Sequence, residues 1–188
     1  IGKHDFSLLV GYQWEDFRYS NIVTGATNLV SNDLPTLNLG DDKTKTNSQA
    51  ISTNAFQSVF GRFNYNYNGK YLLEGTLRRD ESSKLATSLR TKIFPSASVG
   101  WNVNKESWFP NTNVVTELKF RASWGRLGGA LGSVIGNYDY LSQLSRGSAL
   151  VIGNSRTSYL FQNSIPSQSL SWETIESSNG GVDLSLFN

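Results

Sequence analysis

The chain of 188 residues contains no cysteine and no methionine. Without cysteine it can form no disulfide, and it has no thiolate nucleophile and no cysteine-based metal site. The first residue is Ile1. Together with the lack of methionine, this indicates a processed chain or a piece of a longer protein.

Long apolar runs and an excess of one charge are also missing. No run approaches the roughly 18 apolar residues of a membrane-spanning helix, and no leader resembles a signal peptide. This excludes helical membrane insertion, but not insertion as a barrel, whose strands alternate between lipid and lumen. Seventeen basic and fifteen acidic residues leave a net charge of +2 and are scattered along the chain. No nucleic-acid footprint is therefore visible, and we expect no nucleic acid among the partners.

Residues suited to catalysis or metal binding are sparse. His4 is the only histidine, and a general base needs a partner within hydrogen-bonding reach that the sequence does not identify. Asp33, Asp41 and Asp42 lack the spacing of a calcium-binding loop, so we interpret them as solvated loop charges. We expect no enzymatic activity, no metal and no cofactor.

What the chain does have is alternation of apolar and polar residues with a period of two. The clearest case is 56–80, where two alternating runs are joined by Asn68 and Gly69, the dipeptide that most readily takes a positive φ in a tight turn. This predicts a hairpin. Similar alternation predicts strands at 5–15, 92–104, 117–124 and 172–187. The fold class is therefore all-β, with about six antiparallel strands.

The connections between these strands alternate between long and short. Long outer loops are predicted at about 20–53, 81–91 and 126–170, and the last has room for short strands of its own. Transmembrane β-barrels have short turns on the periplasmic side and long loops outside. The pattern predicts six strands of a larger transmembrane β-barrel, with both ends of the chain on the periplasmic side.

The aromatic residues give a second, independent test, because tyrosine and tryptophan collect in two girdles at the interfaces of such barrels. On this topology the girdle aromatics are Tyr65, Tyr67, Tyr71 and Trp101 at the periplasmic end, and Trp14, Trp124 and Trp172 at the outer end. Between the two levels the outward face carries no charge, as expected where Lys or Arg at mid-bilayer costs about 2 to 4 kcal/mol. Its residues are Leu8, Val10, Leu73, Gly75, Leu77, Ala97, Val99, Phe120 and Ala122. Outer-membrane lipid is the partner expected for this face.

Several blocks resemble the SusC/RagA-type TonB-dependent outer-membrane transporters. In order they are FGRFNYNYNGKYLLEGTLRRDESS, FPSASVGWNVNKESWF, ELKFRASWGRLG, IGNYDYLS and LSWETIESSNGGVDLSLFN. The resemblance covers nearly everything from 55 to 188 outside the loops. It implies a barrel of roughly 22 strands whose lumen is plugged by a separate N-terminal domain.

The resemblance also implies a function. Such proteins lie in the outer membrane of Gram-negative cells and import nutrients, often glycan or peptide oligomers. TonB supplies the energy, and a SusD-like surface lipoprotein closes over the outer loops. Residues 1–188 would then form part of the barrel, without the plug and the segment that contacts TonB.

The polar, inward face is where transport residues are expected. By parity its candidates are Arg62, Asn64, Glu74, Thr76, Arg78, Asp80, Lys119 and Arg121. They either pair with one another or with the plug as structural filler, or some of them line the substrate path. Tyr138 and Tyr140 in the last long loop either stack on sugar rings or pack within the loop.

Two other classes of protein stay open. A soluble all-β glycan-binding module would bury its apolar face against a second sheet, whereas a barrel wall presents that face as a band between two aromatic levels. An outer-membrane hydrolase would need a nucleophile and a base, and the single histidine counts against it.

Overall fold

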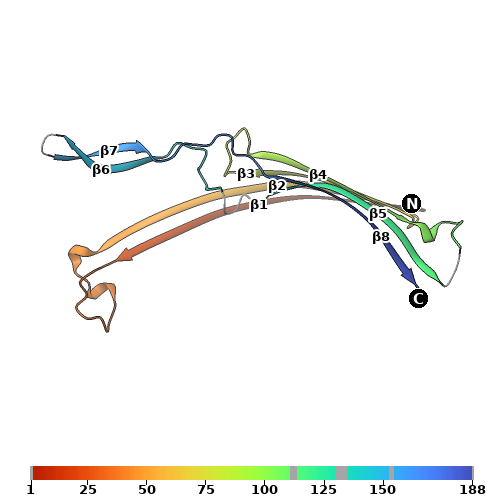
Figure 1. The fold of residues 1–188 in the computed structure, drawn as a ribbon, viewed down its shortest axis with the longest axis horizontal. Coiled ribbons are helices and arrows are strands. Elements are labelled where there is room, and N and C mark those ends of the chain that lie inside the picture. The colour runs from red at the N-terminus through yellow and green to blue at the C-terminus, as the bar shows by residue number, and fades with distance from the viewer. Residues whose placement is uncertain (1, 111–113, 130–134, 153–154, 188) are drawn as a thin grey trace. The chain divides into compact units, whose positions relative to one another are not determined.

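The computed structural model describes residues 2–110, 114–129, 135–152 and 155–187, and almost all of its regular structure is β-strand (Figure 1). In chain order the elements are β1 (His4–Gly25), η1 (Leu37–Leu39), η2 (Asp42–Thr44), β2 (Thr46–Tyr67), β3 (Tyr71–Ser82), β4 (Thr91–Asn102), η3 (Val103–Lys105), β5 (Val115–Gly128), β6 (Leu144–Ile152), β7 (Ser155–Gln162) and β8 (Thr174–Leu186).

Six of the strands form one sheet in the order β1-β2-β3-β4-β5-β8, and β6 and β7 form a two-stranded sheet of their own. Chain neighbours are therefore also sheet neighbours, except that the β6–β7 hairpin is inserted between β5 and β8 (Figure 1). The pairs from β2 to β8 are antiparallel. The predicted all-β fold with six antiparallel strands is confirmed.

The turn between β2 and β3 sets the register of these two strands. Asn68 and Gly69 have φ of 52° and 68°, and the backbone N–H of Lys70 donates to the carbonyl of Tyr67 at 2.8 Å. This turn places Tyr67 opposite Tyr71. A slip by one residue would turn every following side chain to the other face, so this turn decides which residues face which way.

Contacts between Cα atoms divide the chain into two compact units, one of Ile1–Glu15 with Phe56–Asn188 and one of Asp16–Ala55. In the second unit β1 continues to Gly25 and β2 begins at Thr46. The prediction of irregular structure was therefore wrong for 20–25 and 46–53. Both stretches lie in strands whose side chains are mostly exposed, so no apolar face imposes the alternation by which strands are predicted.

The rest of the second unit is a loop held by its own polar groups. The Oγ1 of Thr44 donates to the carbonyl of Thr27 at 3.1 Å and accepts from the Thr27 N–H at 3.0 Å. The Asp41 side chain accepts from the N–H of Lys43 at 3.0 Å.

The other two predicted loops are also shorter than expected. β3 ends at Ser82, so its connection to β4 covers only 83–90. The predicted loop 126–170 contains the end of β5 and the β6–β7 hairpin, for which the sequence left room. Its residues 130–134 and 153–154 lie outside the described residues.

The apolar face of the six-stranded sheet is exposed. Leu8, Leu73, Val99 and Phe120 expose 74%, 43%, 52% and 44% of their surface. Among the described residues the buried hydrophobic side chains are Leu85, Phe94, Val103 and Trp172. A soluble domain of this length is expected to bury a much larger apolar core. The structure therefore argues against the soluble glycan-binding module.

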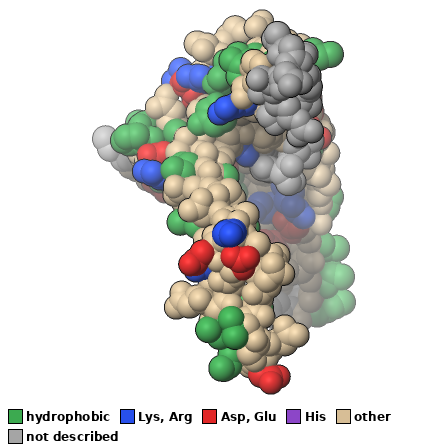
Figure 2. Space-filling view, turned by 90° about the vertical axis from the view of Figure 1, so that its left-hand side faces the viewer, with side chains coloured by type: hydrophobic (Ala, Val, Ile, Leu, Met, Phe, Trp, Pro, Cys, Tyr) green, Lys and Arg blue, Asp and Glu red, His purple; other side chains and the backbone are tan. Residues whose placement is uncertain are grey.

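Charged side chains of the two signs are mixed on the surface. Figure 2 shows Lys and Arg beside Asp and Glu in small groups on the face drawn there. Lys45 and Asp42, in the second unit, form an ion pair with 2.5 Å between the Nζ and the carboxylate. Mixed charges cancel over short distances, so this face offers no broad field of one sign.

Candidate functional site

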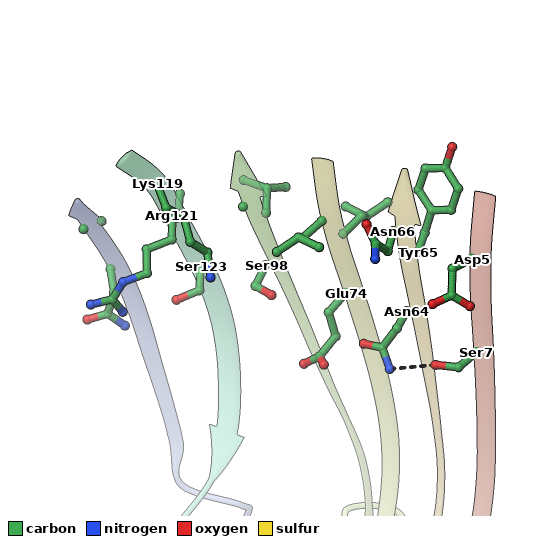
Figure 3. A pocket seen from close by; sticks show the side chains of 18 residues that line it. Asp5, Ser7, Asn64, Tyr65, Asn66, Glu74, Ser98, Lys119, Arg121 and Ser123 are labelled. Carbon is green, nitrogen blue, oxygen red and sulfur yellow. Dashed lines mark hydrogen bonds between the residues drawn. The ribbon is translucent and has the colours of Figure 1, made fainter. Parts of the chain in front are cut away.

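A hollow of about 470 Å³ lies over the polar face of the sheet (Figure 3). The strand register explains why polar groups gather there, because side chains of directly opposed residues share a face. One row runs across five strands, with each residue opposite the next: Asn64, Glu74, Ser98, Ser123 and Asn179. A continuous band of polar side chains therefore crosses the hollow, whose lining also includes Leu72 and, from the apolar face, Leu73 and Val99.

Charge is distributed unevenly around this hollow. Asp5 and Glu74 line it on the side of β1 and β3, whereas Lys119 and Arg121 line it from β5 (Figure 3). The Arg121 Nε donates to Asp183 of β8 at 3.2 Å. Within the described ranges no hydrogen bond or ion pair is formed by the charged groups of Asp5, Glu74 or Lys119. These three charges are free to meet a bound group.

All eight residues predicted to face the lumen share the polar face, as the register requires. Asn64 donates to the Ser7 Oγ at 3.2 Å, and Arg62 stands directly opposite Thr76. Asn64, Glu74, Lys119 and Arg121 line the hollow, whereas Arg62, Thr76, Arg78 and Asp80 do not.

Arg78 and Asp80 form a structural network of their own. The Asp80 carboxylate accepts from the Ser58 Oγ at 2.6 Å and from the Arg78 Nε at 2.7 Å. The Arg78 guanidinium also lies over the rings of Phe56 and Phe60, at 5.9 and 5.8 Å from their centroids. These contacts match the interpretation of this pair as structural filler.

A small apolar cluster lies on the same face near the start of β4. It consists of Leu85, Phe94 and Trp172, with Phe56, Ile135 and Leu170 packed against it. The indole of Trp172 meets the Phe94 ring edge-on at 5.7 Å, and its Nε1 donates to the Arg90 carbonyl at 2.9 Å.

The prediction that Trp172 belongs to the outer girdle was therefore wrong. β8 begins only at Thr174, so Trp172 lies in the preceding segment and is not bound by the alternation of the strand. Phe94 stands opposite Arg78 on the polar face, and Trp172 packs onto it. Burial of the indole with its N–H satisfied explains this position.

Next to the apolar cluster, hydrogen bonds join the connecting segments between strands to one another. The Lys84 Nζ donates to the Ile135 carbonyl at 3.3 Å, and the Gly129 N–H donates to the Glu173 carbonyl at 2.8 Å. Segments from three parts of the sequence are thus held at one place over the polar face.

On the apolar face, aromatic rings form a row near the β2–β3 turn. Ring centroids lie 6.2 Å apart for Tyr67 and Tyr71, 6.5 Å for Tyr71 and Trp101, and 6.2 Å for Trp101 and Phe120. Tyr65 shares this face and stacks on Phe6 at 5.0 Å. The four aromatic residues predicted for the periplasmic girdle thus lie close together on three neighbouring strands, β2, β3 and β4.

Glu106, which the sequence analysis missed, holds the polar tips of this row. Its carboxylate accepts from the Lys70 Nζ at 2.8 Å, the Tyr71 hydroxyl at 2.7 Å and the Trp101 Nε1 at 3.1 Å. These donors, Lys70 first, lower the pKa of Glu106 to about 2. The signal was available, because interfacial Tyr and Trp need partners for their polar groups and Glu106 comes four residues after the end of β4.

At the other end of the apolar face, Trp14 is exposed on β1. On β5 the Trp124 Nε1 donates to one oxygen of Glu176 at 2.8 Å, and the Arg126 Nε donates to the other oxygen at 2.9 Å. The Arg126 guanidinium lies 5.6 Å from the Trp124 ring centroid. Aromatic and charged groups meet here, as they do at a membrane interface.

The two loop tyrosines do not line the hollow. Tyr138 is exposed, in a turn closed by a hydrogen bond from the Leu141 N–H to its carbonyl at 2.9 Å. Tyr140 is half-buried. Their contact with a ligand stays a prediction.

No metal site is visible in the described part of the chain, where no group of three or more His, Asp or Glu residues comes together. Over the same residues, none of the helices has the length and apolar character to cross a membrane.

Comparison with known proteins gives a consistent result. The family described as TonB dependent receptor-like, beta-barrel matches residues 1–188. TonB-dependent receptor P3 of Formosa agariphila is 33% identical over 100% of this chain and 18% of its own length. TonB-dependent receptor SusC of Bacteroides thetaiotaomicron is 28% identical over the same shares. The chain thus spans about a fifth of the length of these relatives.

Among solved structures, the RagAB peptide transporter has a TM-score of 0.85 at 23% identity, covering 100% of this chain and 20% of that one. The RagAB peptide importer in its open-open state gives the same values. The likeness shows a shared fold.

Proposed function

The chain belongs to the TonB-dependent receptor-like β-barrel family, and from this premise we propose that it forms part of the wall of an outer-membrane importer of nutrient oligomers. The observation that carries the proposal is the contrast between the two faces of one sheet. One face exposes Leu8, Leu73, Val99 and Phe120, and the other carries the polar hollow. A sheet with these faces fits between lipid and an aqueous lumen.

The dimensions support the same placement. Phe6 packs beside Tyr65 in the aromatic row near the β2–β3 turn, and Trp14 follows Phe6 eight residues later on β1. At about 3.3 Å per residue this is about 26 Å along the strand, or roughly 20 Å across a membrane once strand tilt is included. The lipid-facing band of such barrels is about 25 Å tall.

The two edge strands of the sheet need further strands to pair with. Within the described residues β1 and β8 each pair with a single neighbour, and an unpaired backbone group in hydrocarbon costs several kcal/mol. The six strands therefore work inside a closed barrel that the rest of the receptor completes. We place a plug domain in that lumen, TonB as the source of energy and a SusD-like lipoprotein over the outer loops.

Transport on this proposal proceeds by binding and gating, without covalent chemistry. The family resemblance implies oligosaccharides or oligopeptides as substrates, and one structure with the same fold is a peptide transporter. The charged groups that line the hollow and the exposed ring of Tyr138 are the groups proposed to contact them.

The test is uptake by Gram-negative cells that carry the complete receptor containing this chain. Labelled oligosaccharide and oligopeptide mixtures are offered to wild-type cells, to cells lacking the receptor and to cells lacking TonB. We expect accumulation of at least one mixture in wild-type cells only. Equal accumulation in all three strains would contradict the proposal.

A further inference from the structure

We infer that the hollow binds a ligand with a cationic group at one end and an anionic group at the other, as in a short peptide with free termini. This inference rests on the proposed function and narrows its substrate class. Asp5 and Glu74 would receive the ammonium group, and Lys119 and Arg121 the carboxylate. A neutral oligosaccharide offers neither charge.

The separation of the charges fits this ligand. Glu74 lies on β3 and Arg121 on β5, two strands apart and offset by two residues in the register. With strands about 4.8 Å apart and about 3.4 Å per residue, their Cα atoms are about 12 Å apart, and those of Glu74 and Lys119 about 17 Å. An extended tetrapeptide reaches about 13 Å.

The state of the charges also favours binding. Glu74, Asp5 and Lys119 form no ion pair within the described ranges, so a ligand need not break one to reach them. Arg121 is shared with Asp183 at 3.2 Å, which makes Lys119 the more available cation. Elsewhere on this face Arg78 and Asp80 neutralise each other at 2.7 Å. Unlike Arg78 and Asp80, the acidic and basic side chains that line the hollow do not form ion pairs with one another.

Neutral polar side chains make up the remainder of the site and could bind the backbone of a peptide. Ser98 lies on β4, between the strands of Glu74 and Arg121, and Asn64 and Ser123 lie in the same row on β2 and β5. Their amide and hydroxyl groups donate and accept hydrogen bonds, as a peptide backbone requires. A ligand spanning the hollow would therefore meet an acid, a neutral polar band and a base in turn.

The test is calorimetric binding of tetra-alanine to the complete receptor containing this chain, purified in detergent. The probes are the free peptide, its N-acetylated form, its C-amidated form and maltotetraose. Removal of either terminal charge is expected to weaken binding about 1.4- to fivefold, because exposed ion pairs contribute about 0.2 to 1 kcal/mol.

Two variants test which residue binds each terminus of the peptide. In Glu74→Gln, N-acetylation should no longer weaken binding while amidation still does, and in Lys119→Gln the reverse should hold. Lys92→Gln is the matched control, because Lys92 lies on the same face opposite Asp80 but outside the hollow. It should behave as the wild type for all four probes.

Several outcomes would overturn the inference. Capped and free peptides could bind equally, the capping effects could persist in both variants, or maltotetraose could bind more tightly than any peptide. In each case the charges of the hollow serve the receptor itself. Uptake that depends on the receptor and on TonB would still support the proposed function, so the two failures are distinguishable.

Discussion

Gly75 gives the sharpest test of which face meets lipid. It lies on the apolar face of β3, four residues from Tyr71 in the aromatic row and four from Arg79 at the other end. At about 3.4 Å per residue it is about 14 Å from each, close to the midplane of the proposed bilayer. A Cβ added at Gly75 meets no atom within 4 Å, so larger side chains fit without strain.

Two substitutions at Gly75 distinguish between a position that faces lipid and one that faces water. Gly75→Leu presents an apolar side chain to lipid, and Gly75→Lys presents an ammonium group, which costs about 2 to 4 kcal/mol at mid-bilayer. Since 1.4 kcal/mol is a factor of about ten, folding should be about 30- to 1000-fold less favourable for the Lys variant than for the Leu variant. On a water-exposed surface the two would differ by about 0.5 kcal/mol or less.

The assay folds the complete receptor into lipid vesicles and measures the folded fraction by its altered gel mobility before heating. Thr76→Lys serves as the control, because Thr76 is the next residue and points to the polar face. It should fold like the wild type. Equal folding of Gly75→Lys and Gly75→Leu, or a loss as large for Thr76→Lys, would refute the lipid-facing assignment.

Two further predictions concern the ends of the sheet. The lowered pKa of Glu106, about 2 against its ordinary 4.5, means that its carboxylate stabilises the fold fully above pH 4.5 and loses this effect as the pH falls toward 2. Glu106→Gln should therefore lower the melting temperature at pH 7, with the difference from wild type closing near pH 2; a difference independent of pH would contradict it. Leu85 is fully buried, so Leu85→Ala should cost about 2 to 5 kcal/mol locally and speed proteolysis within 83–90. Leu160→Ala, on an exposed side chain of β7, should leave that rate unchanged, and equal rates for both variants would count against the cluster.

Where the two faces of a strand differ, the sequence predicted the structure well. β3, β4 and β5 alternate because one face is apolar and the other polar, and the turn at Asn68 fixed their register. The eight candidate lumen residues share one face by the same alternation, and their exposure to a lumen stays a prediction. Parity along a strand needs no knowledge of tertiary contacts.

Where that contrast is absent, prediction from sequence failed. β1 beyond Glu15 exposes both of its faces, as the adjacent Ile22 and Val23 show, so its period is not visible. Trp172 was misplaced because its neighbours Leu85 and Phe94 are distant in sequence. Glu106 was missed because its three donors converge only after the strands pair.

The most direct test of the central assignment is site-directed spin labelling along β3. Because the chain has no cysteine, a single cysteine at each position from 71 to 79 labels one site in this segment, on a receptor cleared of any others. In lipid vesicles, labels at Leu73, Gly75 and Leu77 should collide with oxygen dissolved in the bilayer, and labels at Glu74 and Thr76 should not. Uniform oxygen accessibility along the strand, or alternation of the opposite phase, would contradict the account.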